Sequence, residues 1–329
     1  MALRLVPLVG PFHLRFPRYN AVTVRDVVAA EAPELVLTTA LPAGAFREPD
    51  WKTTEEVALP MAVVPWAHAR GVPLRGAAAP SPDPAARADL ERYLSEATAA
   101  RPAMERLADA EAPMRALLEA ALDQERIVRE LLPAVQAVHD TRLELFGDGP
   151  GTDWLENRAD RMAADLRRAA RGRTVVLAPI EHLPPLLGRL GDDAAFATVA
   201  PPSDEARRRA LLDSALSGEA REPARLLEAL RELAGAEARL AEADVLLAHG
   251  HPAEALEVLE QASRGDFSRP YHVPGWLLAR LGQLYDLAGR RDDARRAYRG
   301  ALALDWAPEA AREAARLGLE RPFGEAPGS

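Results

Sequence analysis

Hydrophobic positions in the first two hundred residues form short continuous runs separated by stretches of helical periodicity. Five runs have the length and composition of β-strands, at residues 3–9, 34–40, 72–74, 174–178 and 196–199. Helical spacing separates them, most clearly at residues 22–32, 55–70 and 183–190. Strand, helix and strand in this order predict βαβ units and a mainly parallel sheet, and the continuous apolar runs favour a sheet buried on both faces.

The pattern changes between the third and fourth predicted strands. Residues 78–85 are rich in Pro, Ala and Ser and indicate a linker, and residues 89–145 are almost entirely helical in pattern. We interpret about residues 85–146 as a helical insertion that lies over the sheet. It is either a structural cap, which we prefer, or a lid that covers a substrate.

No strand pattern remains after residue 203, and several amphipathic helices follow to about residue 319. The fold class predicted is therefore α/β, with a mainly parallel sheet and a helical insertion, followed by an all-α domain of helical repeats. The α/β domain takes residues 1–203, the repeats take residues 204–321, and residues 322–329 are expected to be a disordered tail.

Small and large residues recur at fixed spacing in the last third of the chain. One set consists of Leu281, Gly282, Tyr285, Ala294, Tyr298 and Ala301. With a turn at Gly289, this set resembles the tetratricopeptide (TPR) pattern, in which small residues let two helices approach and aromatic residues fill the gap between them. Gly250 and Ala255 repeat the spacing of Gly289 and Ala294 at an offset of 39 residues, compared with 34 in the family pattern.

Repeats of this kind imply a concave surface that binds a protein or peptide partner. The alternative is that so short an array serves as a cap or as a dimerisation arm, which would make the chain a homo-oligomer. The sequence favours these two interpretations about equally.

Composition and charge limit the chemistry. The formal net charge is −9, and this argues against nucleic acid as the main partner, because phosphate binding needs a basic face. The chain has no cysteine, which excludes disulfides, thiolate metal sites and thiol catalysis. No apolar run is long enough to span a membrane, and Pro7 interrupts the apolar N-terminus, so we expect a cytoplasmic protein. The Arg-rich, Ala-rich composition suggests a GC-rich bacterial genome.

Two histidines follow predicted strands in a similar setting. His13 comes after the first strand, in a Gly10-Pro11-Phe12-His13 segment, and His182 comes after the fourth, in Pro179-Ile180-Glu181-His182. In a parallel sheet both lie beyond the carboxyl ends of strands, where open α/β sheets place their ligand sites. The pair could bind a metal ion, or one imidazole could act as a general base.

The first of these segments resembles the first histidine motif of the TraB/TIKI (erythromycin-esterase/ChaN-like) superfamily. The second half of the motif is similar to the helix that begins near Arg158, the strand after it and the His182-Leu183-Pro184 segment. Arg158 occupies the arginine position of the family pattern. The resemblance covers roughly residues 3–200 and implies metal-dependent peptidase, ester hydrolase or haem-binding activity.

The sequence departs from that pattern at three places. The acidic residues that the family carries after its second and third strands are missing, and Pro179 replaces a glycine. A metal ion that prefers oxygen ligands needs carboxylates beside imidazole. Glu181 could supply one, although an acid in the first turn of a helix is also favoured by the helix dipole, and we prefer that structural interpretation.

Two hypotheses follow. In the first, the protein is a hydrolase of the TraB/TIKI type, with His13, His182 and Arg158 as catalytic residues and a divalent metal ion bound by His13, His182 and Glu181. Arg158 would orient the substrate or stabilise an oxyanion, and the repeats would recruit a partner. In the second, the front domain is a non-catalytic scaffold or a binder of a haem-like small molecule, and the repeats carry the function as an adaptor.

Overall fold

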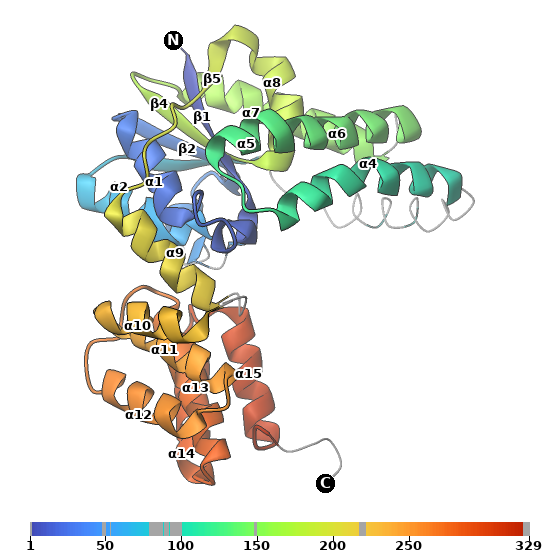
Figure 1. Ribbon diagram of the computed structural model, residues 1–329. Helices are drawn as coiled ribbons and strands as arrows, with labels where there is room; N and C mark the ends of the chain where they lie inside the picture. Colours follow the sequence, from blue (N-terminus) through green and yellow to red (C-terminus); the bar gives the residue numbers. More distant parts are fainter. Residues whose placement is uncertain are drawn as a thin grey trace. The chain divides into compact units, whose positions relative to one another are not determined.

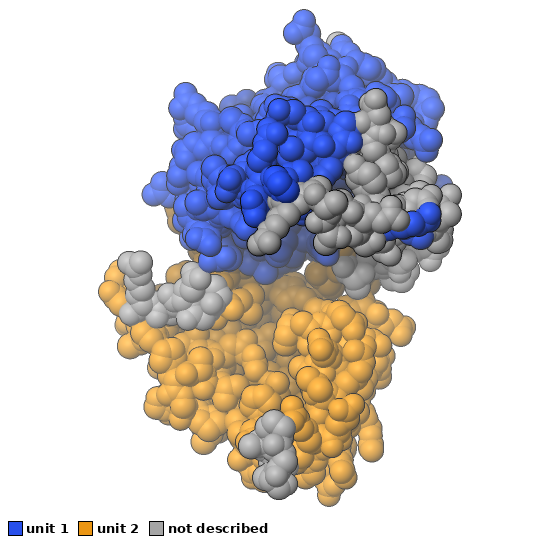
Figure 2. Space-filling model, turned by 90° about the vertical axis from the view of Figure 1, so that its right-hand side faces the viewer, with its two compact units in different colours: residues 1–51, 55–203 blue, residues 52–54, 204–329 orange. Residues whose placement is uncertain are grey.

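The computed structural model describes residues 2–47, 51–52, 54–78, 88, 92, 101–147, 150–216 and 222–324. The chain divides into two compact units, shown in Figure 2. Unit 1 contains Met1–Trp51 and Glu55–Ser203, and unit 2 contains Lys52–Thr54 and Asp204–Ser329. The main division therefore lies between Ser203 and Asp204, where the strand pattern of the sequence ends.

Unit 1 is built on a five-stranded sheet in which all neighbouring strands are parallel. The strands are β1 (Leu3–Leu8), β2 (Leu35–Pro42), β3 (Leu74–Ala78), β4 (Thr174–Pro179) and β5 (Ala194–Phe196). Their spatial order is β3-β2-β4-β1-β5 (Figure 1). The predicted α/β class with a parallel sheet is confirmed, and the central strands β1 and β4 pair in register, with Leu8 opposite Pro179.

Two strands differ most from their predicted bounds. β5 begins two residues before the predicted run and ends three residues before the end of that run, because it pairs only with residues 3–5 of β1. Val199, which the hydrophobic pattern placed in the strand, is 56% exposed. β3 continues through Gly76 to Ala78, since only a residue without a Cβ fits there: a Cβ on Gly76 would lie 2.0 Å from the carbonyl oxygen of Pro42.

Helices cover both faces of the sheet (Figure 1). On one face, α7 (Pro150–Ala169) and α8 (Leu183–Leu190) form a core with inward-facing residues of β1, β2 and β4. On the other, α1 (Ala21–Ala30) packs against β1 and against the π-helical turn Leu59–Val63, which leads into α2 (Val64–Arg70). Burial on both faces explains why the strands are continuous apolar runs.

The segment between β3 and β4 is helical in its described part. It contains α4 (Arg101–Glu119), the short α5 (Gln124–Arg126), the π-helical turn Ile127–Leu131 and α6 (Leu132–Phe146). Leu132 at the start of α6 belongs to the sheet core, and Gln124 Nε2 donates a hydrogen bond of 2.9 Å to the carbonyl of Ala197. The insertion is thus anchored at its base, as a structural cap requires, whereas the predicted linker falls almost entirely on residues outside the described ranges.

Unit 2 consists of helices only in its described residues: α9 (Asp204–Leu216), α10 (Pro223–Glu232), α11 (Ala236–Ala248), α12 (Pro252–Ala262), α13 (Val273–Leu287), α14 (Arg291–Leu302) and α15 (Glu309–Glu320). They pack as successive pairs, α9 with α10, α11 with α12 and α13 with α14, and α15 covers the last pair (Figure 1). Each pair also contacts the first helix of the next pair.

The turns within the second and third pairs have the same geometry. Gly250 and Gly289 have φ angles of +80° and +73°, in the left-handed region that glycine tolerates best. The residues that follow them, His251 and Arg290, donate backbone hydrogen bonds to Leu246 and Tyr285, which stand five residues earlier in each case. The 39-residue offset seen in the sequence therefore corresponds to a repeated structural unit.

An aromatic side chain holds the third pair to the last helix. The ring of Tyr298 is fully buried, and a Cβ on Gly282 or on Gly318 would lie within 2.3 Å of it. Tyr298 also donates a hydrogen bond of 2.9 Å from its hydroxyl group to Asp286. Gly282, a small residue of the sequence pattern, and Gly318, which the pattern did not include, are thus the positions at which α13 and α15 approach the tyrosine.

The predicted tail begins after α15. Phe323 donates its backbone N–H to Asp286 Oδ2 at 2.9 Å, and residues 325–329 lie outside the described ranges. Among the described helices, none is long and apolar enough to cross a membrane.

Candidate functional site

The carboxyl ends of β1 and β4 lie side by side at the centre of the sheet. Each strand is followed by a short 3-10 turn, Gly10–Leu14 after β1 and Ile180–His182 after β4. The helix after β1 lies on one face of the sheet and the helix after β4 on the other (Figure 1). The connections after β1 and β4 therefore run to opposite faces of the sheet at this edge. This is the arrangement that places ligand sites in open α/β sheets.

The imidazole of His13 is turned inward and is fully buried. Its Nε2 accepts the backbone N–H of Val9 at 3.1 Å, and its Nδ1 lies 2.8 Å from the carbonyl oxygen of Tyr19, to which it donates. Burial lowers the pKa of His13 to about 4, although the bond to Tyr19 opposes this shift. Both nitrogens are used by the backbone, so His13 holds the β1–α1 connection together.

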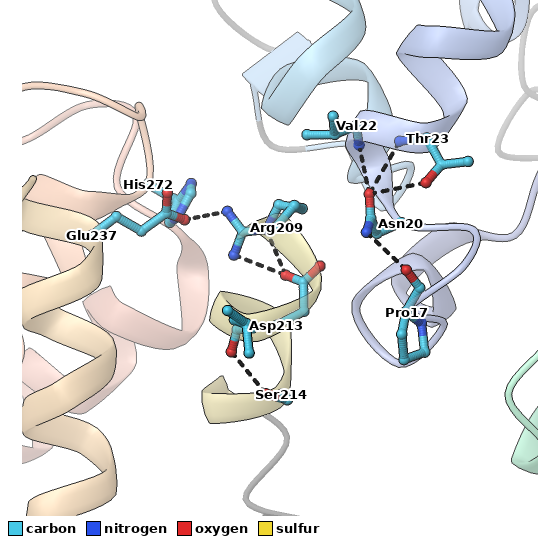
Figure 3. A network of polar contacts seen from close by, with 10 residues as sticks. Pro17, Asn20, Val22, Thr23, Arg209, Asp213, Ser214, Glu237 and His272 are labelled. Carbon is cyan, nitrogen blue, oxygen red and sulfur yellow. Dashed lines mark hydrogen bonds and ion pairs between the residues drawn. The ribbon is translucent and has the colours of Figure 1, made fainter. Parts of the chain in front are cut away.

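The same connection is fixed by two further buried residues. The Tyr19 hydroxyl donates to the carbonyl of Pro7 at 2.8 Å. Asn20 caps α1 through its side-chain oxygen, which accepts the backbone N–H groups of Val22 and Thr23 at 3.1 Å each, as Figure 3 shows. These bonds satisfy the first amides of the helix. They give His13 a structural explanation that needs no ligand.

His182 has a different environment. It is 7% exposed, and its Nδ1 lies 3.1 Å from the hydroxyl oxygen of Thr39, at the carboxyl end of neighbouring β2. Burial, and then the positive charge of Arg158, lower the pKa of His182 to about 3. The ring is therefore neutral near pH 7 and is too weakly basic to be an efficient general base there.

The strongest acid–base candidate is Glu56, in the segment between β2 and α2. It is 8% exposed, and its Oε2 accepts the backbone N–H of Gly10 at 3.0 Å. Burial and the negative charge of Glu181 raise the pKa of Glu56 to about 8, although the bond from Gly10 opposes this shift. A buried carboxyl group that titrates near neutral pH is typical of catalytic acids and bases.

Glu181 and Arg158 complete the group. Because α7 precedes β4 and β4 is parallel to its neighbours, the amino-terminal half of α7 lies toward the carboxyl ends of the strands. Arg158 stands one turn before Met162, whose side chain packs on the sheet. Partial desolvation raises the pKa of Glu181 and lowers that of Arg158, and the attraction between the two charges opposes both shifts.

The predicted metal site does not form as proposed. His13 offers no nitrogen to a metal ion, because both are hydrogen-bonded to the backbone. Within the described parts of the chain, no three His, Asp or Glu side chains are close enough together to hold one ion. His182, Glu181 and Arg158 do lie within electrostatic reach of one another, as the pairwise effects on their pKa values show. The structure therefore brings together three of the four predicted residues.

Two residues of this group were not predicted from the sequence. Glu56 lies nineteen positions beyond Leu37 of β2 and accepts the N–H of Gly10, and Thr39 contacts His182. One signal could have identified Glu56. Within the stretch of helical pattern at residues 55–70 it shares a face with Pro60, Val63 and Ala67, which are all buried, so the periodicity itself places a carboxyl group on the apolar face.

Comparison with known proteins does not identify this site. No protein-family model, no curated protein and no solved structure matches the chain. The resemblance of unit 1 to the TraB/TIKI superfamily and of unit 2 to tetratricopeptide repeats therefore stays a prediction, and the function has to be argued from the geometry described above.

Proposed function

We propose that unit 1 is a hydrolase domain that works by general acid–base catalysis at the carboxyl edge of its sheet. The observation that carries this proposal is the environment of Glu56. Its carboxyl group is buried, it is fixed by the N–H of Gly10, and burial and Glu181 raise its pKa to about 8.

The chemistry follows from the charges. Near pH 7 Glu56 is mostly protonated and can donate a proton to a leaving group, as a catalytic acid does. The guanidinium group of Arg158 can stabilise the negative charge that develops on an oxygen atom during attack on an ester or amide carbonyl. Glu181, which lies beside Arg158, can accept a proton from the attacking water. Ester or amide hydrolysis is also what the resemblance to the TraB/TIKI superfamily implies.

The test is a hydrolysis screen of the full chain with p-nitrophenyl acetate, p-nitrophenyl butyrate and a peptide p-nitroanilide. The matched variants are Glu56→Gln, which keeps the side-chain shape, and Glu34→Gln, which removes an exposed carboxylate at the opposite edge of the sheet. We expect Glu56→Gln to lose 10²-fold or more in kcat/KM, on the order of a lost general acid, and Glu34→Gln to match the wild type.

The pH dependence provides a second readout. If protonated Glu56 is the acid, kcat/KM falls as the pH rises through about 8. Equal rates for Glu56→Gln and the wild type, or a rate that stays constant from pH 7 to pH 9, would overturn the assignment of Glu56.

A second candidate function rests on unit 2. Three helix pairs, two of them with the same glycine turn, support an adaptor of the tetratricopeptide type. In that arrangement the first helices of the pairs, α9, α11 and α13, would line the surface that binds a protein or peptide. The structural role of His13 also favours this candidate, since it removes one of the two predicted catalytic histidines.

The two candidates predict different results for the full chain. A partner that is bound equally by the wild type and by Glu56→Gln, together with no hydrolysis of any of the three probes, supports the adaptor. Sedimentation of the purified chain over a range of concentrations tests the remaining alternative, a dimerisation arm, which requires a dimer in the absence of any other protein.

A further inference from the structure

Thr39 gives His182 a hydrogen-bond partner that decides where the imidazole proton lies. The Thr39 side chain is fully buried in the carboxyl-terminal half of β2, and its Oγ1 lies 3.1 Å from Nδ1 of His182 in the 3-10 turn after β4. The two residues are 143 positions apart in the sequence and meet because β2 and β4 are neighbours in the sheet. A neutral imidazole has one protonated and one unprotonated nitrogen, so this contact has two possible directions.

The burial of the hydroxyl group favours one direction. Within the described part of the chain, Nδ1 of His182 is the one hydrogen-bond partner of the Thr39 hydroxyl. If Nδ1 carried the proton, it would donate to Oγ1, and the hydroxyl proton of Thr39 would be buried without an acceptor, which is costly. If the hydroxyl donates to Nδ1, both groups are satisfied and the ring proton lies on Nε2.

Nε2 of His182 can form its hydrogen bond outside the protein core. It has no hydrogen-bond partner in the described residues, and it is not among the polar atoms sealed from solvent without one. An N–H group at that position is therefore available to water or to a bound molecule. Arg158 lies close enough to affect the charge state of the same ring.

We infer that Thr39 is a positioning residue that fixes His182 as a neutral Nε2–H donor, and that this donor and Arg158 bind the carbonyl oxygen of an ester or amide substrate. The role of His182 is to donate a hydrogen bond and not to transfer a proton. Separately, burial keeps the ring neutral, since it lowers the pKa of His182 to about 3. Neutral imidazoles that polarise a carbonyl group are an established catalytic device.

This inference rests on the proposed hydrolase function for its use, but its test needs no substrate. The tautomer of His182 is read from long-range ¹H–¹⁵N correlation spectra of the uniformly ¹⁵N-labelled full chain. His182→Asn identifies the His182 signals among those of the seven histidines by their loss. Thr39→Val removes the hydroxyl group at nearly constant volume, and Thr39→Ser retains it.

We expect the proton on Nε2 in the wild type and in Thr39→Ser, and a changed Nδ1 signal with both tautomers populated in Thr39→Val. A proton on Nδ1 in the wild type, or a Thr39→Val spectrum identical to that of the wild type, would overturn the inference. If Thr39→Val does not fold, the wild type and Thr39→Ser decide alone, because an Nε2 proton in both supports the inference and an Nδ1 proton in either contradicts it.

The hydrolysis screen separates this inference from the proposed function. With p-nitrophenyl acetate as the probe, Thr39→Val should lower kcat at least tenfold and Thr39→Ser should restore it, if both proposals hold. An Nε2 proton without any hydrolysis would contradict the proposed function and leave the tautomer assignment intact. Hydrolysis that depends on Glu56, together with a proton on Nδ1 of His182, would support the proposed function and contradict the tautomer assignment.

Discussion

Glu56 in unit 1 and Glu237 in unit 2 are both buried glutamates, yet their pKa values move in opposite directions. Burial and the nearby Glu181 raise the pKa of Glu56 to about 8. Burial would raise the pKa of Glu237 as well, but the hydrogen bond from His272 and the charge of Arg209 bring it down to about 2. Burial alone therefore does not set the direction of a pKa shift, because the charges and hydrogen bonds around each carboxyl group add to its effect.

The surroundings of Glu237 form an ionic network, shown in Figure 3. Arg209 on α9 is 6% exposed and forms ion pairs with Asp213 on its own helix and with Glu237 on α11. His272, just before α13, lies 2.9 Å from Glu237 through its Nε2. The network joins α9, α11 and the residue before α13, and elsewhere in unit 2 the pairs of Asp244 with Arg280 and of Asp286 with Arg291 each join two helices. Unit 2 thus uses buried charge to hold helices together.

The largest effect expected is for Arg209→Met, which leaves Asp213 and Glu237 buried without their shared cation. We expect the free energy of unfolding to fall by about 4 kcal/mol, as for other broken buried ion pairs, measured by urea denaturation at pH 7. Arg207→Met is the matched control, because Arg207 lies on the same helix in an exposed pair with Asp204. A loss below about 1 kcal/mol, similar to that of a surface pair, would show that the network does not stabilise unit 2.

The second effect concerns the histidine that serves the fold of unit 1. Its folded pKa of about 4 lies below the value of 6.5 for an unperturbed histidine. His13 therefore contributes stability that is present above pH 6.5 and is lost as the pH falls from 6.5 to 4. The loss is roughly 3 kcal/mol, since each pH unit between the two pKa values is worth about 1.4 kcal/mol.

The measurement is the free energy of unfolding of the wild type and of His13→Gln between pH 7 and pH 4. The variant should be less stable at pH 7 and should show a shallower loss toward pH 4. Parallel curves for the two proteins would mean that His13 is not held in its neutral form by the fold.

The third effect tests the comparison of the two glutamates directly. Because the folded pKa of Glu56 lies above its ordinary value of 4.5, the wild type loses stability from this group as the pH rises from 4.5 to 8. Glu56→Gln has no such group and should be more stable than the wild type at pH 9. Glu237→Gln should be less stable than the wild type, because it leaves Arg209 without one of its anions.

Thermal and urea unfolding at pH 5 and pH 9 measure both variants. Opposite signs at pH 9 are the expected result. The same sign for both variants would mean that the two carboxyl groups have equivalent roles and would remove the argument that Glu56 belongs to an active site.

The smallest effect is expected for Tyr298→Phe, which removes a neutral donor from Asp286 and leaves the ion pair with Arg291 in place. A hydrogen bond to a charged group contributes on the order of 1.5 kcal/mol, so we expect a loss of that size in the free energy of unfolding. Thermal unfolding measures it, with Tyr285→Phe on the same repeat as the control, since Tyr285 is only partly buried. A loss above about 3 kcal/mol would show that the charge of Arg291 does not satisfy Asp286 by itself.

Much of the fold follows from the sequence because local periodicity reports burial. Strand-length apolar runs predicted all five strands, since a sheet covered on both faces has no solvent-facing positions to interrupt a run. The predicted end of the last strand was wrong, because Val199 is apolar but has no partner strand beside it. Gly250 and Gly289 predicted the turns between helices correctly, since a backbone with a positive φ angle strongly favours glycine.

The candidate site could be predicted only in part. Its location followed from the sequence, because residues after parallel strands collect at one edge of a sheet. Arg158, Glu181 and His182 are at that edge. His13 is there as well, but the sequence could not reveal that Val9 and Tyr19 use both of its nitrogens, since hydrogen bonds to backbone groups leave no residue pattern.

The sequence by itself determined the class of unit 1, the division after residue 203 and the repeated spacing in unit 2, because each depends on the order of apolar and small residues along the chain. Only the tertiary structure decided which polar groups are partners. The contacts of Gly10 with Glu56 and of Thr39 with His182 join segments 46 and 143 positions apart. The pKa values of the buried carboxyl groups depend on distances of a few ångströms between such segments, and linear sequence does not encode these distances locally.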